Sequence, residues 1–253
     1  MKTALITGAT AGIGKSTAQI FAENGYNVII TGRRQERLKT FKQELIEKYN
    51  IKVLDLCFDV RDKAQVKAHL GNLPEDWQAI DVLVNNAGLA SGLDPIQTGD
   101  LEDWDKMVDT NIKGLLYVSR TIIPLMTARH QGHIVNIGSI AGKEVYANGN
   151  VYCATKHAVD ALSKAMRIDL LPHGIKVTNI APGLVDTEFS TVRFHGDQAK
   201  ADAVYQNIEP LHDKDIAEVI WFAANRPANV NLNDVLIMPT IQANATTIVR
   251  KNN

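Results

Sequence analysis

The sequence has very few cysteines for its length. Only Cys57 and Cys153 occur among 253 residues, which is too few for a disulfide framework. Cys57 lies in an apolar run, and Cys153 lies between a tyrosine and an alanine. Both cysteines are therefore expected to be reduced and packed, as in a cytoplasmic protein.

Charge of one sign and long apolar stretches are also lacking. The 27 basic and 28 acidic residues leave a formal net charge of −1, which argues against a nucleic-acid or anionic-membrane surface. No segment has the apolar length of a membrane span, and Met1 leads at once into a strand rather than a signal peptide. The seven histidines are scattered, so no metal site is predicted. A small-molecule substrate is the partner we expect.

Strands and helices alternate along the whole chain. Apolar, β-branched runs predict strands at 3–7, 27–31, 52–58, 80–84, 133–137, 175–180 and 235–238. Helical spacing predicts helices at 13–24, 34–48, 63–70, 101–126, 152–171 and 213–225. This alternation indicates an α/β fold, a parallel sheet of about seven strands with helices on both faces. The length of 253 residues and the 45% hydrophobic content fit a single domain over 1–253.

A glycine-rich turn separates the first strand from the first helix. It reads TGATAGIG from Thr7 to Gly14. Glycines let the backbone turn tightly and approach a pyrophosphate, which then rests on the amide groups at a helix N-terminus. Three residues separate Gly8 from Gly12, so the spacing differs from the commonest dinucleotide fingerprint. The position of the turn nevertheless favours dinucleotide binding.

The segment from Ser139 to Lys156 combines a hydroxyl, a phenol and an ammonium. On a helix Tyr152 and Lys156 lie on one face, because they are four residues apart. An ammonium lowers the phenol pKa of about 10, so Tyr152 is a candidate general acid or base. Ser139 ends a predicted strand, and its hydroxyl can donate to a carbonyl oxygen. Alternatively the tyrosine–lysine spacing is an accident of the helix and Ser139 merely ends a strand.

The end of the second strand bears on the choice of cofactor. A carboxylate there binds the ribose 2′-hydroxyl of NAD, but here the strand leads into Gly32, Arg33 and Arg34. A guanidinium can pair with a 2′-phosphate by charge-assisted hydrogen bonds. We therefore predict NADP, with Arg33 the first candidate and Arg34 the second. The alternative is two solvated arginines at the start of a charged helix.

Four motifs in order resemble the short-chain dehydrogenase/reductase family over essentially the whole chain. They are the TGxxxGxG turn at 7–14, the NNAG segment at 85–88, Ser139, and the YxxxK motif at 152–156. The resemblance implies a Rossmann-type doubly wound sheet of strand order 3-2-1-4-5-6-7. It also implies an NADP-dependent enzyme acting on CH–OH groups, commonly a homotetramer.

The resemblance also assigns roles to single residues. Ser139 orients the substrate oxygen, Tyr152 exchanges its proton, and Lys156 lowers the phenol pKa and binds the nicotinamide ribose. Asn111, inside the predicted helix 101–126 that Pro124 bends or ends, matches a residue that sustains the proton path through water. Asn111 could otherwise lie on an exposed polar face. The residues assigned to the cofactor are Thr7, Gly8, Thr10, Gly12, Ile13, Gly14, Arg33, Arg34, Asp59, Val60, Asn86, Ala87, Gly88, Tyr152, Lys156, Pro182, Gly183, Val185 and Thr187. For Asp59 the alternative is a cap on the helix that starts near Asp62.

The segment 184–212 follows the sixth strand, where an open α/β sheet places its ligand crevice. Its amino-acid sequence, with TEFS at 187–190 and VRF at 192–194, resembles that of the NADP-dependent 3-hydroxy acid dehydrogenases, which also oxidise serine. We expect this segment to cover a small hydroxy acid of the serine, 3-hydroxypropionate or 3-hydroxyisobutyrate type, or the matching semialdehyde. Arg193 is the candidate cation for the substrate carboxylate, which would be costly to bury unpaired. A surface ion pair is the alternative for Arg193.

Other functions remain open at this point. The same four catalytic residues also serve reductases of uncharged ketones and diketones. A non-catalytic cofactor-sensing protein on the same fold is a remote alternative, because it predicts a broken set of catalytic residues. Finally, apolar residues cover so much of helix 152–171 that one sheet face cannot bury them all, and we expect a subunit interface there.

Overall fold

Seven parallel strands form the central sheet of the computed structural model, which describes residues 1–251. The strands are β1 (Thr3–Ile6), β2 (Asn27–Gly32), β3 (Val53–Cys57), β4 (Ile80–Asn85), β5 (His133–Ile137), β6 (Lys176–Pro182) and β9 (Asp234–Ile237). Their spatial order is β3-β2-β1-β4-β5-β6-β9, so the predicted order of seven strands is confirmed. The order reverses on either side of β1, and a doubly wound sheet binds its ligand at that switch point.

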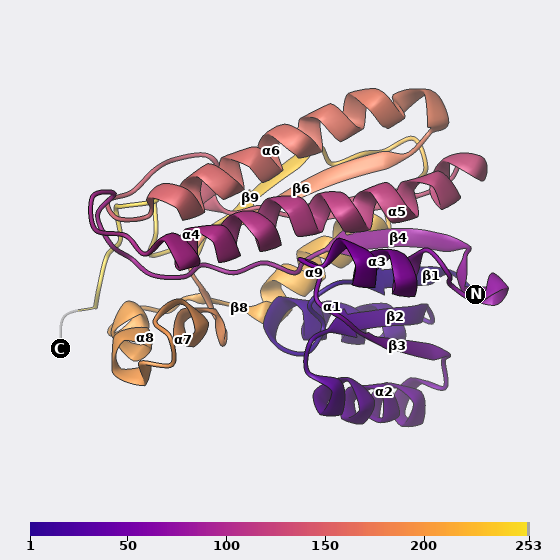
Figure 1. Cartoon of the computed structure of the whole chain (residues 1–253), viewed down its shortest axis with the longest axis horizontal. Helices are drawn as coiled ribbons and strands as arrows, with labels where there is room; N and C mark the ends of the chain where they lie inside the picture. Colours follow the sequence, from indigo (N-terminus) through magenta and orange to yellow (C-terminus); the bar gives the residue numbers. More distant parts are fainter. Residues whose placement is uncertain (252–253) are drawn as a thin grey trace.

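Helices cover both faces of this sheet (Figure 1). The first face packs against α1 (Gly12–Glu23), α2 (Gln35–Tyr49) and α9 (Asp213–Ala224). The second packs against α3 (Lys63–Leu70), α5 (Leu115–Ala128) and α6 (Asn150–Leu170). The predicted helices therefore form within a few residues of their expected bounds. Among the described residues, none of the helices combines the length and the apolar character that a bilayer crossing requires.

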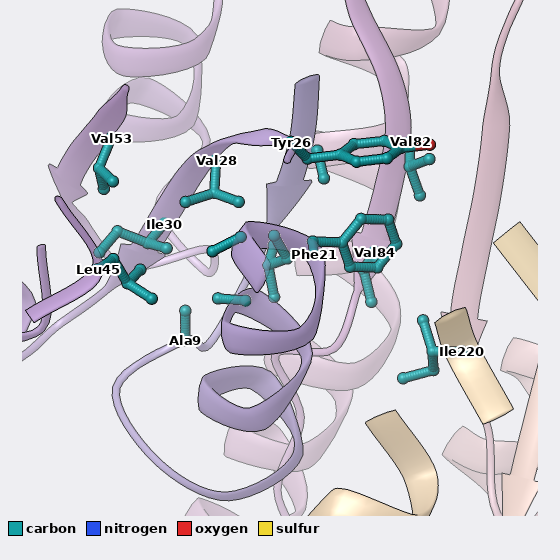
Figure 2. Packing of buried hydrophobic residues seen from close by; sticks show 14 of the residues in the cluster. Ala9, Phe21, Tyr26, Val28, Ile30, Leu45, Val53, Val82, Val84 and Ile220 are labelled. Carbon is teal, nitrogen blue, oxygen red and sulfur yellow. The ribbon is translucent and has the colours of Figure 1, made fainter. Parts of the chain in front are cut away.

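Aromatic packing holds α1 against the sheet and α9. Phe21 is fully buried and makes edge-to-face contacts with Tyr26 and Trp221 at centroid distances of 5.1 and 5.3 Å. Figure 2 shows the Phe21 and Tyr26 rings among the side chains of Val82 and Val84. Burial of one such ring stabilises the fold by about 2 to 3 kcal/mol. The contacts fix the direction of α1 and hence the place where its N-terminus lies.

The predicted helix 101–126 is three helical segments in succession. They are α4 (Leu101–Val108), the π-helical segment η2 (Asp109–Gly114) and α5. Asn111 lies in η2 and is 2% exposed, so the exposed polar face considered for it is wrong. Pro124 lies inside α5, which continues to Ala128, so of the two expected effects, bending or ending the helix, the second is excluded. Proline removes one backbone donor, and packing of α5 on the sheet maintains the helix around that gap.

The segment 184–212 has regular structure that the sequence pattern did not predict. It contains β7 (Val185–Asp186), α7 (Phe189–Arg193), α8 (Gln198–Tyr205) and β8 (Leu211–His212), and β7 pairs with β8. Figure 1 shows α7 and α8, in orange, standing apart from the layers of the sheet. We call residues 184–212 the covering segment.

Candidate active site

A cavity of about 470 Å³ opens at the carboxyl ends of the strands. Most of the predicted site residues line it, and they come from the ends of β1 to β6, the starts of α1 and α6, and the covering segment. These residues are Gly8, Thr10, Gly12, Ile13, Arg33, Arg34, Asp59, Val60, Asn86, Ala87, Gly88, Ser139, Tyr152, Lys156, Pro182, Gly183, Val185, Thr187 and Arg193. Three other predicted residues, Thr7, Gly14 and Asn111, do not line the cavity.

The glycine turn forms a cradle that fits a pyrophosphate. Gly8 and Gly12 have φ of +69° and +50°, a left-handed conformation that other residues rarely adopt. A Cβ on Gly14 would lie 2.5 Å from Asn86 Nδ2, so only glycine lets α1 approach this closely. Ala11 gives α1 no side-chain cap, and the first turn contains no acidic residue. The N–H groups at this helix end can therefore receive an anion.

Thr7 and Asn86 hold this cradle together from behind. Thr7 Oγ1 accepts from the N–H groups of Asn86 and Ala87, both at 3.0 Å. Asn86 Nδ2 donates to the carbonyl oxygen of Thr7 at 2.8 Å. The Thr7 hydroxyl oxygen and the Asn86 amide thus form their hydrogen bonds within the protein. We therefore interpret both side chains as linking the loop after β1 to the loop after β4.

The two predicted phosphate-binding arginines differ in their surroundings. Arg33 is 58% exposed, and its nearest carboxylate is Asp59 at 3.9 Å. Arg34 donates to Thr10 Oγ1 and to a carboxylate oxygen of Glu188. The guanidinium of Arg33 thus has fewer close partners within the protein than that of Arg34. This leaves Arg33 the first candidate to bind the 2′-phosphate.

Asp59 does not cap α3, so that alternative is wrong. The cap is Asp62, whose carboxylate accepts from the N–H groups of Ala64 and Gln65. Asp59 instead binds the guanidinium of Arg61 at 2.7 Å. Burial disfavours its ionised form, but the hydrogen bonds from Arg61 hold the pKa of Asp59 below its ordinary value. Asp59 therefore faces the cavity as a carboxylate.

The start of α6 brings the predicted catalytic side chains together. Tyr152 and Lys156 are 8% and 6% exposed, and Lys156 Nζ lies 5.9 Å from the centre of the Tyr152 ring. Lys156 donates to the carbonyl oxygen of Ile137 at 2.9 Å. Ser139 lies at the end of β5, and its Oγ accepts from the N–H of Ala141 at 3.1 Å. The predicted grouping of Ser139, Tyr152 and Lys156 is therefore present.

Burial dominates the electrostatics of this group. It raises the pKa of Tyr152 above its ordinary value, against the opposing effects of the Ser139 hydrogen bond and the Arg193 charge. Burial also lowers the pKa of Lys156 to about 8. The predicted lowering of the phenol pKa by Lys156 is thus not found: desolvation outweighs the two opposing effects, which come from Ser139 and Arg193 and not from Lys156. Lys156 is poised to exchange a proton near neutral pH.

Asn111 is anchored within the protein next to this group. Its Oδ1 accepts from the N–H of Leu89, and its Nδ2 donates to the Leu89 carbonyl oxygen and to Thr155 Oγ1, at 2.8 to 3.0 Å. A Cβ on Gly88 would lie 3.2 Å from Asn111 Oδ1 and 3.5 Å from Lys156 Nζ. Asn111 therefore holds the loop after β4 beside the lysine.

Arg193 on α7 reaches the same end of the cavity. Its guanidinium carbon lies 5.6 Å from the ring centre of Tyr146 and 5.7 Å from that of Tyr152. Nε donates to the Gly92 carbonyl oxygen, whereas Nη2 is buried without a hydrogen-bond partner among residues 1–251. Within residues 1–251 no carboxylate forms an ion pair with Arg193, so the alternative that Arg193 forms a surface ion pair is wrong. A buried, unpaired guanidinium nitrogen is costly and is suited to an anionic ligand.

Several lining residues were missed by sequence reasoning. Tyr146, Glu188 and Tyr205 line the cavity, as does Gln242, which is 6% exposed and accepts from the Leu184 N–H. Tyr146, Tyr205 and Gln242 lie in no motif, and the fold brings them to the cavity. Glu188 had one signal, its place beside Thr187 in the TEFS stretch. Within the described range of 1–251, no three His, Cys, Asp or Glu side chains gather as a metal-binding group.

Comparison with known proteins identifies the family. The family model described as short chain dehydrogenase matches residues 2–198. The chain belongs to this family. The fold and the grouping of Ser139, Tyr152 and Lys156 described above agree with that membership.

Individual relatives match nearly the full length. The chain is 50% identical over 249 residues to the NADP-dependent 3-hydroxy acid dehydrogenase YdfG of Salmonella typhi, covering 98% of this chain and 99% of that one. It is 44% identical over 251 residues to the NADP-dependent 3-hydroxy acid dehydrogenase of Schizosaccharomyces pombe, covering 99% and 97%. Among solved structures, the closed form of serine dehydrogenase complexed with NADP⁺ superposes with a TM-score of 0.91 at 47% identity, covering 99% and 100%.

The lowered pKa of Lys156 predicts how stability depends on pH. Between about 8 and 10.5 the unfolded chain keeps a proton that folded Lys156 has lost. Lys156 should therefore contribute a rise in the free energy of unfolding with pH in this window, of at most about 1.4 kcal/mol per pH unit. Lys156→Met should remove this contribution, so its slope should be lower than that of Lys164→Met, at an exposed position of the same helix, which retains it. Urea denaturation from about pH 7.5 to 9.5, below the range in which phenols titrate, measures this; equal slopes in both variants would contradict it.

Proposed function

We propose that this chain is a cytoplasmic, homotetrameric, NADP-dependent dehydrogenase of small 3-hydroxy acids. Its substrates are of the serine, 3-hydroxypropionate or 3-hydroxyisobutyrate type, or the matching semialdehydes in the reverse direction. The observation that carries the proposal is the buried and unpartnered Nη2 of Arg193 beside Tyr152. The names of the relatives, two of them 3-hydroxy acid dehydrogenases and one a serine dehydrogenase, support it.

NADP is supported by the charges around the end of β2. Gly32 ends the strand where an NAD-preferring site would place a carboxylate, and Arg33 and Arg34 follow it. Thr10, from the glycine turn, lies against Arg34 and so places this charge next to the pyrophosphate cradle. Arg33 and Arg34 would hold the 2′-phosphate, and the α1 N-terminus would hold the pyrophosphate. The bound nicotinamide supplies or accepts the hydride.

Acid–base chemistry falls to the residues at the start of α6. In reduction the Tyr152 phenol gives its proton to the substrate oxygen, and in oxidation the phenolate, formed once the phenol has passed its proton to neutral Lys156, takes the hydroxyl proton. Ser139 donates to the substrate oxygen and so holds it at the phenol. Lys156, with a pKa near 8, passes the proton onward, and Asn111 keeps the loop beside Lys156 in place. Tyr152, Ser139 and Lys156 are thus the catalytic residues, and Asn111 is a positioning residue.

Carboxylate recognition falls to Arg193. The guanidinium lies over the rings of Tyr146 and Tyr152, where water access is limited and an ion pair is stronger than at the surface. A substrate carboxylate that accepts from Nη2 would place its 3-carbon hydroxyl near the Tyr152 phenol. The covering segment, which carries Arg193, then closes over the substrate and excludes water.

Initial rates test the substrate class. We expect reduction of NADP⁺, followed by the absorbance of the reduced nicotinamide, with L-serine, 3-hydroxypropionate and 3-hydroxyisobutyrate, and little with NAD⁺. Tyr152→Phe should abolish turnover and leave cofactor binding nearly intact. Activity only on an uncharged secondary alcohol would reject the hydroxy acid assignment and favour the reductase of uncharged carbonyls.

Substitution of Arg193 separates carboxylate binding from catalysis. Arg193→Met should raise KM for 3-hydroxypropionate by about tenfold or more, since a charge-assisted hydrogen bond contributes about 1.5 to 3 kcal/mol. KM for an uncharged alcohol should change far less. Lys200→Met, an exposed cation on α8, is the matched control and should leave both values unchanged. Equal increases for both substrates would remove the role of Arg193.

The homotetramer is supported by apolar residues that α6 leaves uncovered. Ile168 near the end of α6 and Leu171, the residue that follows the helix, are each 74% exposed. Apolar surface of this kind is commonly buried between subunits. Light scattering after size-exclusion chromatography should give the mass of four 27.8 kDa chains. A mass of one chain would contradict the assembly.

A further inference from the structure

Glu188 connects Arg34, one of the two predicted phosphate-binding arginines, and Arg37 to the covering segment. One oxygen of its carboxylate accepts from Arg34 Nη1 and the other from Arg37 Nη1, both at 2.7 Å. The two arginines lie at the start of α2, 154 and 151 positions earlier in the chain. The hydrogen bond from Arg34, above all, lowers the pKa of Glu188, so its carboxylate is ionised. Glu188 also lines the cavity.

This carboxylate uses donors that a phosphate would use. Charge-assisted hydrogen bonds from guanidinium groups hold carboxylates and phosphates in the same geometry. Nε and Nη2 of Arg34 each donate to Thr10 Oγ1, so a phosphate that approaches Nη1 meets the Glu188 carboxylate there. Two anions close to one guanidinium repel each other. Glu188 and a 2′-phosphate are therefore competitors for Arg34.

Glu188 also lies directly before the elements that contact the catalytic tyrosine. Thr187 Oγ1 accepts from the Phe189 N–H, and the Phe189 ring packs against the Tyr152 ring at a centroid distance of 5.7 Å. Arg193 ends the same short helix α7. Release of Glu188 from the arginines would therefore loosen one anchor of the covering segment.

We propose that Glu188 is a cofactor-specificity residue that exchanges with the 2′-phosphate on Arg34. In the free protein it neutralises Arg34 and Arg37 and fastens the covering segment to α2. Binding of a 2′-phosphate displaces it, and the segment is then free to move over the substrate. A nucleotide without this phosphate leaves the contact closed. The inference rests on the proposed NADP function, because it needs the 2′-phosphate near Arg34.

Two nucleotides that differ only in the 2′-phosphate test the exchange. Isothermal titration calorimetry compares adenosine 2′,5′-bisphosphate with adenosine 5′-monophosphate on the full chain. Glu188→Gln should bind the bisphosphate about fivefold more tightly than the parent, the change expected for two exposed ion pairs of ordinary strength. Its affinity for the monophosphate should not change. The control is Glu36→Gln, which removes the same charge from α2, where Glu36 pairs with Lys39, and should match the parent for both nucleotides.

Proteolysis tests the connection to the covering segment. Lys200 on α8 is 69% exposed and is a trypsin site within this segment. Saturating bisphosphate should speed cleavage after Lys200 in the parent, and the monophosphate should not. Glu188→Gln should be cleaved at the faster rate without any nucleotide.

The outcomes separate this inference from the proposed function. If the parent chain binds both nucleotides equally, the NADP function fails. If it prefers the bisphosphate but Glu188→Gln binds it no more tightly than the parent, only the role of Glu188 is overturned. Cleavage rates that do not respond to the bisphosphate in the parent would overturn the connection to the covering segment.

Discussion

The close approach of α1 to the loops after β1 and β4 is the constraint on which the site depends. Gly14 has no side chain, and a Cβ there would lie 2.5 Å from Asn86 Nδ2, much closer than van der Waals contact allows. The Phe21 ring packs the other end of α1 against Tyr26 and Trp221. The Gly14 contact and the Phe21 packing together set where the N-terminus of α1 lies. They therefore set the position of the anion cradle relative to the ends of the strands.

Sequence reasoning predicted what local patterns determine. The apolar runs predicted the strands that are buried on both faces, and the glycine spacing predicted the turn. The four-residue spacing of Tyr152 and Lys156 predicted that they share a face of α6. It did not predict η2, because a π-helical turn has no apolar period of its own. It also missed Tyr146 and Gln242, which reach the cavity only through tertiary packing.

The pKa of Tyr152 shows the same limit in energetic terms. The spacing of Tyr152 and Lys156 indicates a Coulombic attraction, and that argument alone lowers the phenol pKa. Sequence contains no measure of how deeply each group is desolvated, and here desolvation is the larger effect for both. The sign of the shift therefore depended on burial, which only the complete fold determines.

The π-helical segment also acts as a phase shift between two helices. Each residue of an α-helix turns the chain by about 100°, so an inserted residue rotates everything before it relative to everything after it. In this chain the rotation lets α5 turn its apolar face to the sheet while α4 turns Asp103 toward Ser91 and His195. One long helical stretch thereby presents two independent faces, one that packs on the core and one that faces Ser91 and His195.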